Sequence, residues 1–286
     1  MNRMQRSWAL AKSSWAVLKS EKALLWLPVL SFLFSAIVVA VFALAAWATL
    51  GKETGLNRDH EYSANVVTYL LGFCTYIGVA FVQTYFLAAL CVGANERLQG
   101  RDTNLGMALG VAQSRLHRIL PWAILSATVS VIIQAIEERF GILGRIIGGL
   151  FGAAWNVVTF LSVPIIIFED VGPITALKRS GHLLKQTWGE NLMAQIGLGL
   201  IGLIAFIPGA IVIGLGIAAG DMLVTIPLVA VGAVLLAVAI SIVSALSGIY
   251  RTALYRYAVD GHVPDAFAST DMEHAFGQRK GLARGF

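Results

Sequence analysis

Charged residues are scarce in this sequence, and their scarcity limits the kind of protein it encodes. Only 13% of its 286 residues are Asp, Glu, Lys or Arg, whereas 57% are hydrophobic. A soluble domain is roughly a quarter charged. The mean hydropathy of +0.76 is typical of a chain surrounded by hydrocarbon. Because apolar stretches occupy most of the length, no soluble domain with its own core fits beside them.

Residues that build catalytic or metal sites are also few. The two cysteines, Cys74 and Cys91, fall in one apolar stretch, too far apart along a helix to bond to each other. The five histidines lie outside the apolar stretches, and their spacings match no ligand motif. The sequence has no HExxH, GxSxG or Walker pattern, and no GxGxxG after a strand. We therefore expect no metal, no cofactor and no enzymatic activity.

The stretches without charge are long enough to cross a membrane. A hydrocarbon core about 30 Å thick needs about 20 apolar residues in a helix. We predict an all-α integral membrane protein with one polytopic domain at residues 1–260 and a cytoplasmic tail at residues 261–286. The predicted spans are residues 24–50, 65–94, 119–136, 146–168, 192–219 and 223–250.

The basic residues predict the orientation of these spans. Seventeen of the 21 Lys and Arg residues fall at one set of span ends, which includes both ends of the chain. Because cytoplasmic loops carry the excess of basic residues, we expect both termini in the cytoplasm. The net charge of +5 is explained by this topology and by anionic headgroups, so we expect no nucleic acid partner.

Each of three predicted hairpins follows a basic segment that could lie along the membrane surface. Such helices place basic residues among lipid headgroups, and Asn104 is a candidate N-cap of the second one. For the first segment, a plain cytoplasmic extension of span one stays open as an alternative. The candidate headgroup-binding residues are Lys12, Lys19, Arg115, Arg118, Lys178 and Lys185.

Two features inside the spans suggest close packing or a pathway. Gly144, Gly148 and Gly152 recur every four residues, a stripe that lets helices approach closely in lipid. The pattern leaves open whether the partner helix belongs to the same chain. Asn156 lies deep in the same span, and Pro208-Gly209 predicts a kink in span five. If a solute path exists, we expect it at these residues, since a broken helix needs protein or a watery cavity around it.

Several segments resemble an uncharacterised prokaryotic family of six-span integral membrane proteins, classed only as a domain of unknown function. They are SWALAKSSWAVLKSEKALLWLPVLS, ANERLQGRDTNLGMALGVAQSRLHRIL, GAAWNVVTFLSVPIIIFED and FEDVGPITALKRSGHLLKQTWGEN. More distantly, ALKRSGHLLKQTW is similar to a loop in the membrane domain of some bacterial glycerophosphodiester phosphodiesterases. The sequence has no counterpart of their catalytic barrel, so this likeness implies no activity. The resemblance implies a multi-pass protein of the prokaryotic cytoplasmic (inner) membrane.

Two functions from different classes fit these features. In the first, the protein is a non-enzymatic scaffold or accessory protein that interacts with anionic lipid or a membrane partner. In the second, it is an oligomeric channel or transporter for a small solute, with an uncharged pathway. The first is favoured because no span has an ionisable residue at its centre, whereas transport paths usually carry one.

Overall fold

The computed structural model of the protein describes residues 14, 15, 18, 23–50, 66–186 and 188–261. Over these residues it has helices and no strand, which confirms the predicted all-α class. The helices are α2 (Ala23–Leu50), α3 (Val66–Leu98), α4 (Leu105–Ser114), α5 (Leu116–Arg139), α6 (Gly141–Val158), α7 (Ser162–Glu169), α8 (Pro173–Gln186), α9 (Trp188–Ala218) and α10 (Met222–Asp260).

Five stretches of the described chain are long and apolar enough to cross a membrane, as in a multi-pass membrane protein. They are Leu24–Ala48, Val66–Leu98, Leu116–Arg139, Gly141–Glu169 and Met222–Asp260. In α2, large apolar side chains such as Phe32, Leu33 and Val41 are exposed. A helix that is apolar on all sides needs an apolar surrounding, which a bilayer supplies.

The fourth predicted span, residues 146–168, falls within the apolar stretch Gly141–Glu169, but its helix is divided in two. The chain forms α6 up to Val158 and α7 from Ser162, with a turn between them. The turn is closed by short-range hydrogen bonds, from Phe160 N–H to the Val157 carbonyl at 3.1 Å and from Ser162 N–H to the Thr159 carbonyl at 3.0 Å. Pro164 has no N–H to donate to the Phe160 carbonyl, and proline is tolerated only in the first turn of the new helix.

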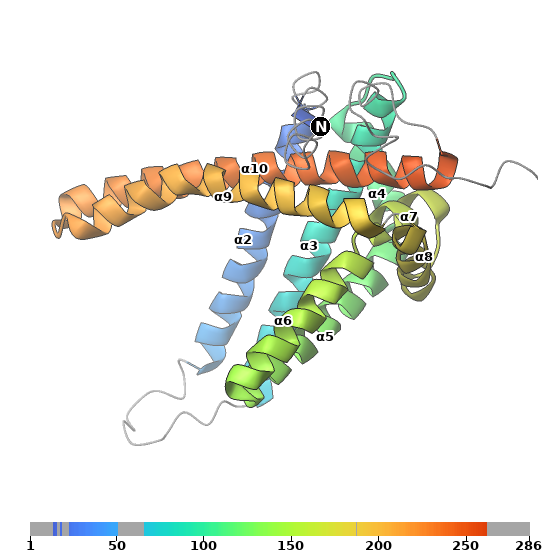
Figure 1. Ribbon diagram of the computed structural model, residues 1–286. Helices are drawn as coiled ribbons and strands as arrows, with labels where there is room; N and C mark the ends of the chain where they lie inside the picture. Colours follow the sequence, from blue (N-terminus) through green and yellow to red (C-terminus); the bar gives the residue numbers. More distant parts are fainter. Residues whose placement is uncertain (1–13, 16–17, 19–22, 51–65, 187, 262–286) are drawn as a thin grey trace, which may run out of the picture.

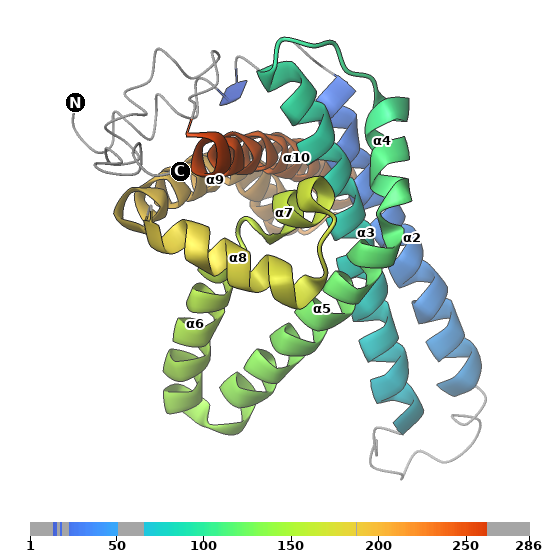
Figure 2. The same ribbon diagram turned by 90° about the vertical axis from the view of Figure 1, so that its right-hand side faces the viewer.

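The helices form three hairpins that share one packed hub. We define the hub as residues 82–98 of α3, residues 245–258 of α10, and α7, which hold much of the buried cluster. Helices α2 and α3 diverge from α5 and α6 away from the hub, with their far ends well apart (Figure 2). Since the buried residues concentrate at the hub, the hairpins are held together mainly there.

The third hairpin, α9–α10, does not run alongside the other two. Figures 1 and 2 both show it crossing α2 and α3 near the hub. The predicted arrangement of six spans in three hairpins, each preceded by a surface helix, stays a prediction. The pair contacts the rest of the chain mainly through the hub end of α10, while large side chains farther out, including Leu203, Ile211 and Met222, are exposed.

Hairpin α9–α10 is held together where two glycines meet. A Cβ added to Gly209 would lie 2.6 Å from Leu236 Cδ2 and 3.1 Å from the Gly232 carbonyl oxygen, so a larger residue forces the helices apart. Helix α9 continues through Pro208 without interruption. The helix break expected near Pro208-Gly209 is therefore found instead between α6 and α7.

We predict that Gly209→Leu destabilises the protein more than Gly214→Leu on the same helix. A Cβ at Gly214 meets nothing within 4 Å, whereas overpacking a tight contact costs about 1–3 kcal/mol. Thermal unfolding of the detergent-purified protein should show a lower melting temperature for Gly209→Leu alone. Equal melting of the two variants would show that the glycine contact is not required.

Candidate functional site

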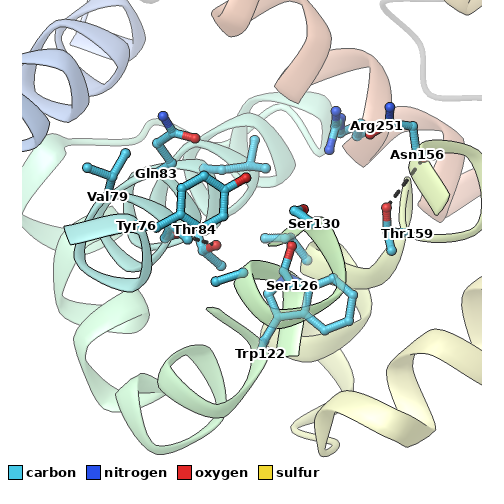
Figure 3. A pocket seen from close by; sticks show the side chains of 14 residues that line it. Tyr76, Val79, Gln83, Thr84, Trp122, Ser126, Ser130, Asn156, Thr159 and Arg251 are labelled. Carbon is cyan, nitrogen blue, oxygen red and sulfur yellow. Dashed lines mark hydrogen bonds between the residues drawn. The ribbon is translucent and has the colours of Figure 1, made fainter. Parts of the chain in front are cut away.

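A cavity of 460 Å³ lies between the first and second hairpins at the hub (Figure 3). Arg251 and Asn156 stand on one side of it and Gln83 and Tyr76 on the other, with Ser126 between them. Gln83 and Asn156 are exposed, so the cavity is open. Its lining residues are Tyr76, Val79, Ala80, Gln83, Thr84, Leu87, Trp122, Ser126, Ala127, Ser130, Asn156, Thr159, Val163 and Arg251. We refer to it as the polar cavity.

A second cavity of 470 Å³ lies between the first hairpin and α10. It shares Gln83, Leu87 and Arg251 with the polar cavity. Its lining residues are Pro28, Ser31, Phe32, Ser35, Gln83, Phe86, Leu87, Leu90, Ile240, Val243, Ser244, Ser247 and Arg251. Most of this lining is hydrocarbon, and we refer to it as the apolar cavity. Arg251 therefore lies in the wall that the two cavities share, which we refer to as their junction.

Arg251 is placed by the packing of α10 against α3 and the α6–α7 turn. Gly248, one turn earlier on α10, faces Leu90 with no side chain between the helices. The ring of Tyr250 lies 6.0 Å from that of Phe160. The Arg251 guanidinium carbon lies 4.5 Å from the centre of the same Phe160 ring, within the range of a cation–π contact.

The charge of Arg251 has no carboxylate partner among the residues that the structure describes. Its Nε is enclosed and has no hydrogen-bond acceptor. The next arginine on the helix differs, because Arg256 donates to Asn95 Oδ1 at 2.6 Å and to Asp260 Oδ2 at 3.3 Å. Arg251 is half-buried, and an arginine withdrawn from water is usually paired. Arg251 is thus a cation beside a cavity of uncharged hydrogen-bonding groups.

The turn between α6 and α7 forms part of the polar cavity. Thr159 lines it and donates from its hydroxyl to the Trp155 carbonyl at 2.7 Å. The N–H of Leu161, left without a partner in its own helix, donates to the Ser180 hydroxyl of α8 at 3.2 Å. The broken helix is therefore completed by a side chain from α8, as a buried backbone group requires.

The predicted pathway residues do not lie together. Asn156 lines the polar cavity, but Pro208 and Gly209 line neither cavity.

Arg251 was not predicted as a site residue because it was counted with the basic residues of the inner face. Its position at the end of the Ser241, Ser244 and Ser247 row was the available signal. Likewise, Pro164 was the signal for the helix break.

The predicted headgroup residues fall into three groups. Lys12 and Lys19 lie outside the described residues, and Lys178 and Lys185 are exposed on α8. Arg115 and Arg118 instead form ion pairs with Asp170 at the α7–α8 turn, at 3.3 Å for Arg118. Partial burial favours the neutral carboxyl, but the hydrogen bond from Arg118 and the nearby positive charges hold the pKa of Asp170 below its ordinary value.

The glycine stripe packs within the chain. Gly144 and Gly148 of α6 are buried, and an added Cβ at either position would meet residues of α5 or of the α5–α6 turn. An added Cβ at Gly152 would meet only Ile133 of α5, at 3.9 Å. Next to the polar cavity, the rings of Trp122 and Trp155 stack with centroids 6.4 Å apart. The stripe thus brings α6 against α5 and sets one wall of the cavity.

The part of the chain that the structure describes is all-helical, with five stretches long and apolar enough to cross a membrane. Residues 65–265 match DUF6159, a family of unknown function. Because the match covers more than half of the sequence, the chain belongs to this family, which confirms the expected membership of an uncharacterised family. Neither a curated protein nor a solved structure matches the chain.

We predict that Ser180→Ala lowers the stability of the protein by about 1–3 kcal/mol, because the Leu161 N–H would be left buried without an acceptor. Thr175→Ala, at an exposed position of the same helix, is the matched control and should melt like the unmodified protein. Thermal unfolding in detergent measures both. An unchanged melting temperature for Ser180→Ala would contradict the assigned role of its hydroxyl.

Proposed function

We propose that this is a non-enzymatic, multi-pass membrane protein that binds an anionic lipid at Arg251. The observation that supports the proposal most strongly is a guanidinium with no carboxylate partner among the described residues, at the junction of two cavities. Lipid binding is consistent with a scaffold or accessory role. No described residue cluster supports a catalytic mechanism, and the proposal requires none.

The physical argument concerns the cost of withdrawing a charge from water. Removing a guanidinium fully from water costs several kcal/mol unless an opposite charge or strong hydrogen bonds offset it, and the half-buried Arg251 bears part of this cost. The Phe160 ring offsets only part of this cost, since a cation–π contact is worth about 0.5–2 kcal/mol. A phosphate accepts two parallel hydrogen bonds from arginine. An anion at Arg251 would therefore stabilise the hub as well as occupy the site.

The surface of α8 supports the same proposal. Lys178 and Lys185 are exposed there, and each basic residue near an anionic membrane surface contributes about 1 kcal/mol of attraction. Arg115 and Arg118 contribute less to such attraction, because Asp170 already neutralises part of their charge. In the proposed orientation, α8 faces the cytoplasmic leaflet, and anionic lipid concentrates near the opening of the cavities.

The proposed topology has six spans with both termini in the cytoplasm. It requires hairpin α9–α10 to cross the bilayer beside the others, rather than across them as in Figure 1. The exposed side chains of Leu203, Ile211 and Leu223 support this, because hydrocarbon around the pair removes them from water. The proposal keeps α10 in place from Ile240 onward, where it lines the apolar cavity, and realigns only the part of the pair farther from the hub.

Transport of a small anion is the second candidate. The helix break at residues 159–161 lies beside the polar cavity, and discontinuous helices line substrate sites in many transporters. This candidate needs a continuous path, whereas lipid binding needs only the cavities. Flux of a small anion into proteoliposomes, abolished by Arg251→Gln, would favour transport over lipid binding.

We predict that phosphatidylglycerol raises the melting temperature of the detergent-purified protein and that Arg251→Gln loses most of this rise, since a ligand stabilises only the state it binds. Lys178→Gln removes one exposed charge and should keep most of it. Phosphatidylcholine is the uncharged control for the lipid. An equal rise for Arg251→Gln and the unmodified protein would refute binding at this residue.

For the topology, we predict the sides on which single cysteines react in a variant lacking Cys74 and Cys91. Met222→Cys, at the α9–α10 turn, should react with an impermeant thiol reagent from the same side as Phe140→Cys at the α5–α6 turn. Asp102→Cys, in the loop before α4, should react only from the opposite side. If Met222→Cys reacted from the same side of the membrane as Asp102→Cys, the six-span topology would be contradicted.

A further inference from the structure

The two cavities differ in chemistry, and their junction carries the charge. The polar cavity is lined by amides and hydroxyls, including Gln83, Asn156 and Ser130. The apolar cavity is lined largely by hydrocarbon from Phe32, Phe86, Leu90, Ile240 and Val243. Each volume, 460 and 470 Å³, lies within the range of about 300–1,000 Å³ found for small-molecule sites. A ligand that fits both must itself be polar at one end and apolar at the other.

We propose that the two cavities hold one anionic phospholipid, with its phosphodiester at Arg251, its headgroup in the polar cavity and an acyl chain in the apolar cavity. This assignment rests on the proposed function, because it requires an anion at Arg251. It goes further in that it names the ligand as an amphiphile and states how it is oriented. A free phosphate or a headgroup without a chain would leave the apolar cavity unused.

The residues around the junction suit this orientation. Ser244 and Ser247 of α10 lie on the apolar cavity within two turns of Arg251, where ester oxygens next to the phosphate would accept hydrogen bonds. Gln83 lines both cavities and can donate to the phosphate or to a headgroup hydroxyl. Ser35 Oγ, on the apolar cavity, is enclosed and has no partner among the described residues. The apolar cavity therefore has at least one hydroxyl group that is free to donate to a ligand.

The headgroup expected in the polar cavity is one with hydroxyl groups. The cavity supplies several neutral donors and acceptors, among them Thr84, Ser126 and Ser130, and none of its lining residues is acidic. A cationic headgroup would find no carboxylate there, whereas a glycerol headgroup can form hydrogen bonds with amides and hydroxyls. The geometry therefore favours a phosphoglycerol headgroup over a phosphocholine one.

The test measures binding of three probes to the full-length protein in an uncharged detergent. The probes are a short-chain phosphatidylglycerol, phosphatidylcholine of the same chain length, and glycerol phosphate without a chain. Ser244→Trp fills the apolar cavity from an exposed position. Val238→Trp, at an exposed position of the same helix that lines neither cavity, is the matched control for a bulky residue on α10.

We expect Ser244→Trp to weaken phosphatidylglycerol binding by about tenfold or more, because the chain loses its apolar site, and to leave glycerol phosphate binding unchanged. Val238→Trp should bind all three probes like the unmodified protein. Arg251→Gln should weaken both phosphoglycerol probes. Lengthening the acyl chains should raise affinity for the unmodified protein, a comparison that does not depend on the folding of any variant.

The outcomes separate this inference from the proposed function. If glycerol phosphate binds as tightly as the lipid and Ser244→Trp has no effect, the apolar cavity holds no chain, and only the anion site stands. If Arg251→Gln leaves both phosphoglycerol probes unaffected, the proposed function fails as well. Equal affinity for phosphatidylglycerol and phosphatidylcholine would overturn the assignment of the headgroup.

Discussion

The structure depends on one constraint, which is that a polar group out of reach of water must be satisfied by the protein or by a ligand. The chain meets this constraint at the α6–α7 turn, where Ser180 accepts the hydrogen bond of the Leu161 N–H. It meets it at the α7–α8 turn, where Asp170 pairs with Arg115 and Arg118. Several enclosed side-chain atoms of the described residues do not meet it, among them Arg251 Nε and Ser35 Oγ, whose residues both line the apolar cavity. The proposed ligand follows from these two.

The hub concentrates these features in one part of the molecule. The close approach of α10 to α3 at Gly248 places Arg251 beside the Phe160 ring. The turn that ends α6 supplies Phe160 as well as Thr159 of the polar cavity. The break in the helix, the arginine and the cavity are therefore parts of one arrangement. The hairpins beyond the hub present mostly apolar side chains, as membrane-facing surfaces do.

The all-α class and the presence of helices long and apolar enough to cross a membrane followed from the sequence, because charge-free runs of this length are unambiguous. Gly144 and Gly148 were predicted to pack closely, and the structure adds that their partner is α5 of the same chain. Asn104 was predicted to cap α4 and does so, accepting from the Met107 N–H at 2.7 Å. These are local features, determined by residues near one another in the sequence.

The site could not be predicted in the same way, since it depends on residues far apart in the sequence. Gln83, Asn156 and Arg251 come from α3, α6 and α10, and no periodicity places them together. A helix break was predicted at Pro208, but the observed break lies just before Pro164. Pro164 falls in the first turn of a new helix, α7, which other elements stabilise, whereas Pro208 lies inside the continuous helix α9. The headgroup role of Arg115 and Arg118 was inferred from charge alone, and the sequence could not show that Asp170, more than 50 residues away, pairs with both.

The most direct test of the central claim is a structure determined in a bilayer that contains phosphatidylglycerol. Our interpretation predicts phosphate density within hydrogen-bonding distance of the Arg251 guanidinium, with a chain extending past Ser244. A carboxylate of the protein paired with Arg251, or a junction filled by side chains with no room for a ligand, would contradict it.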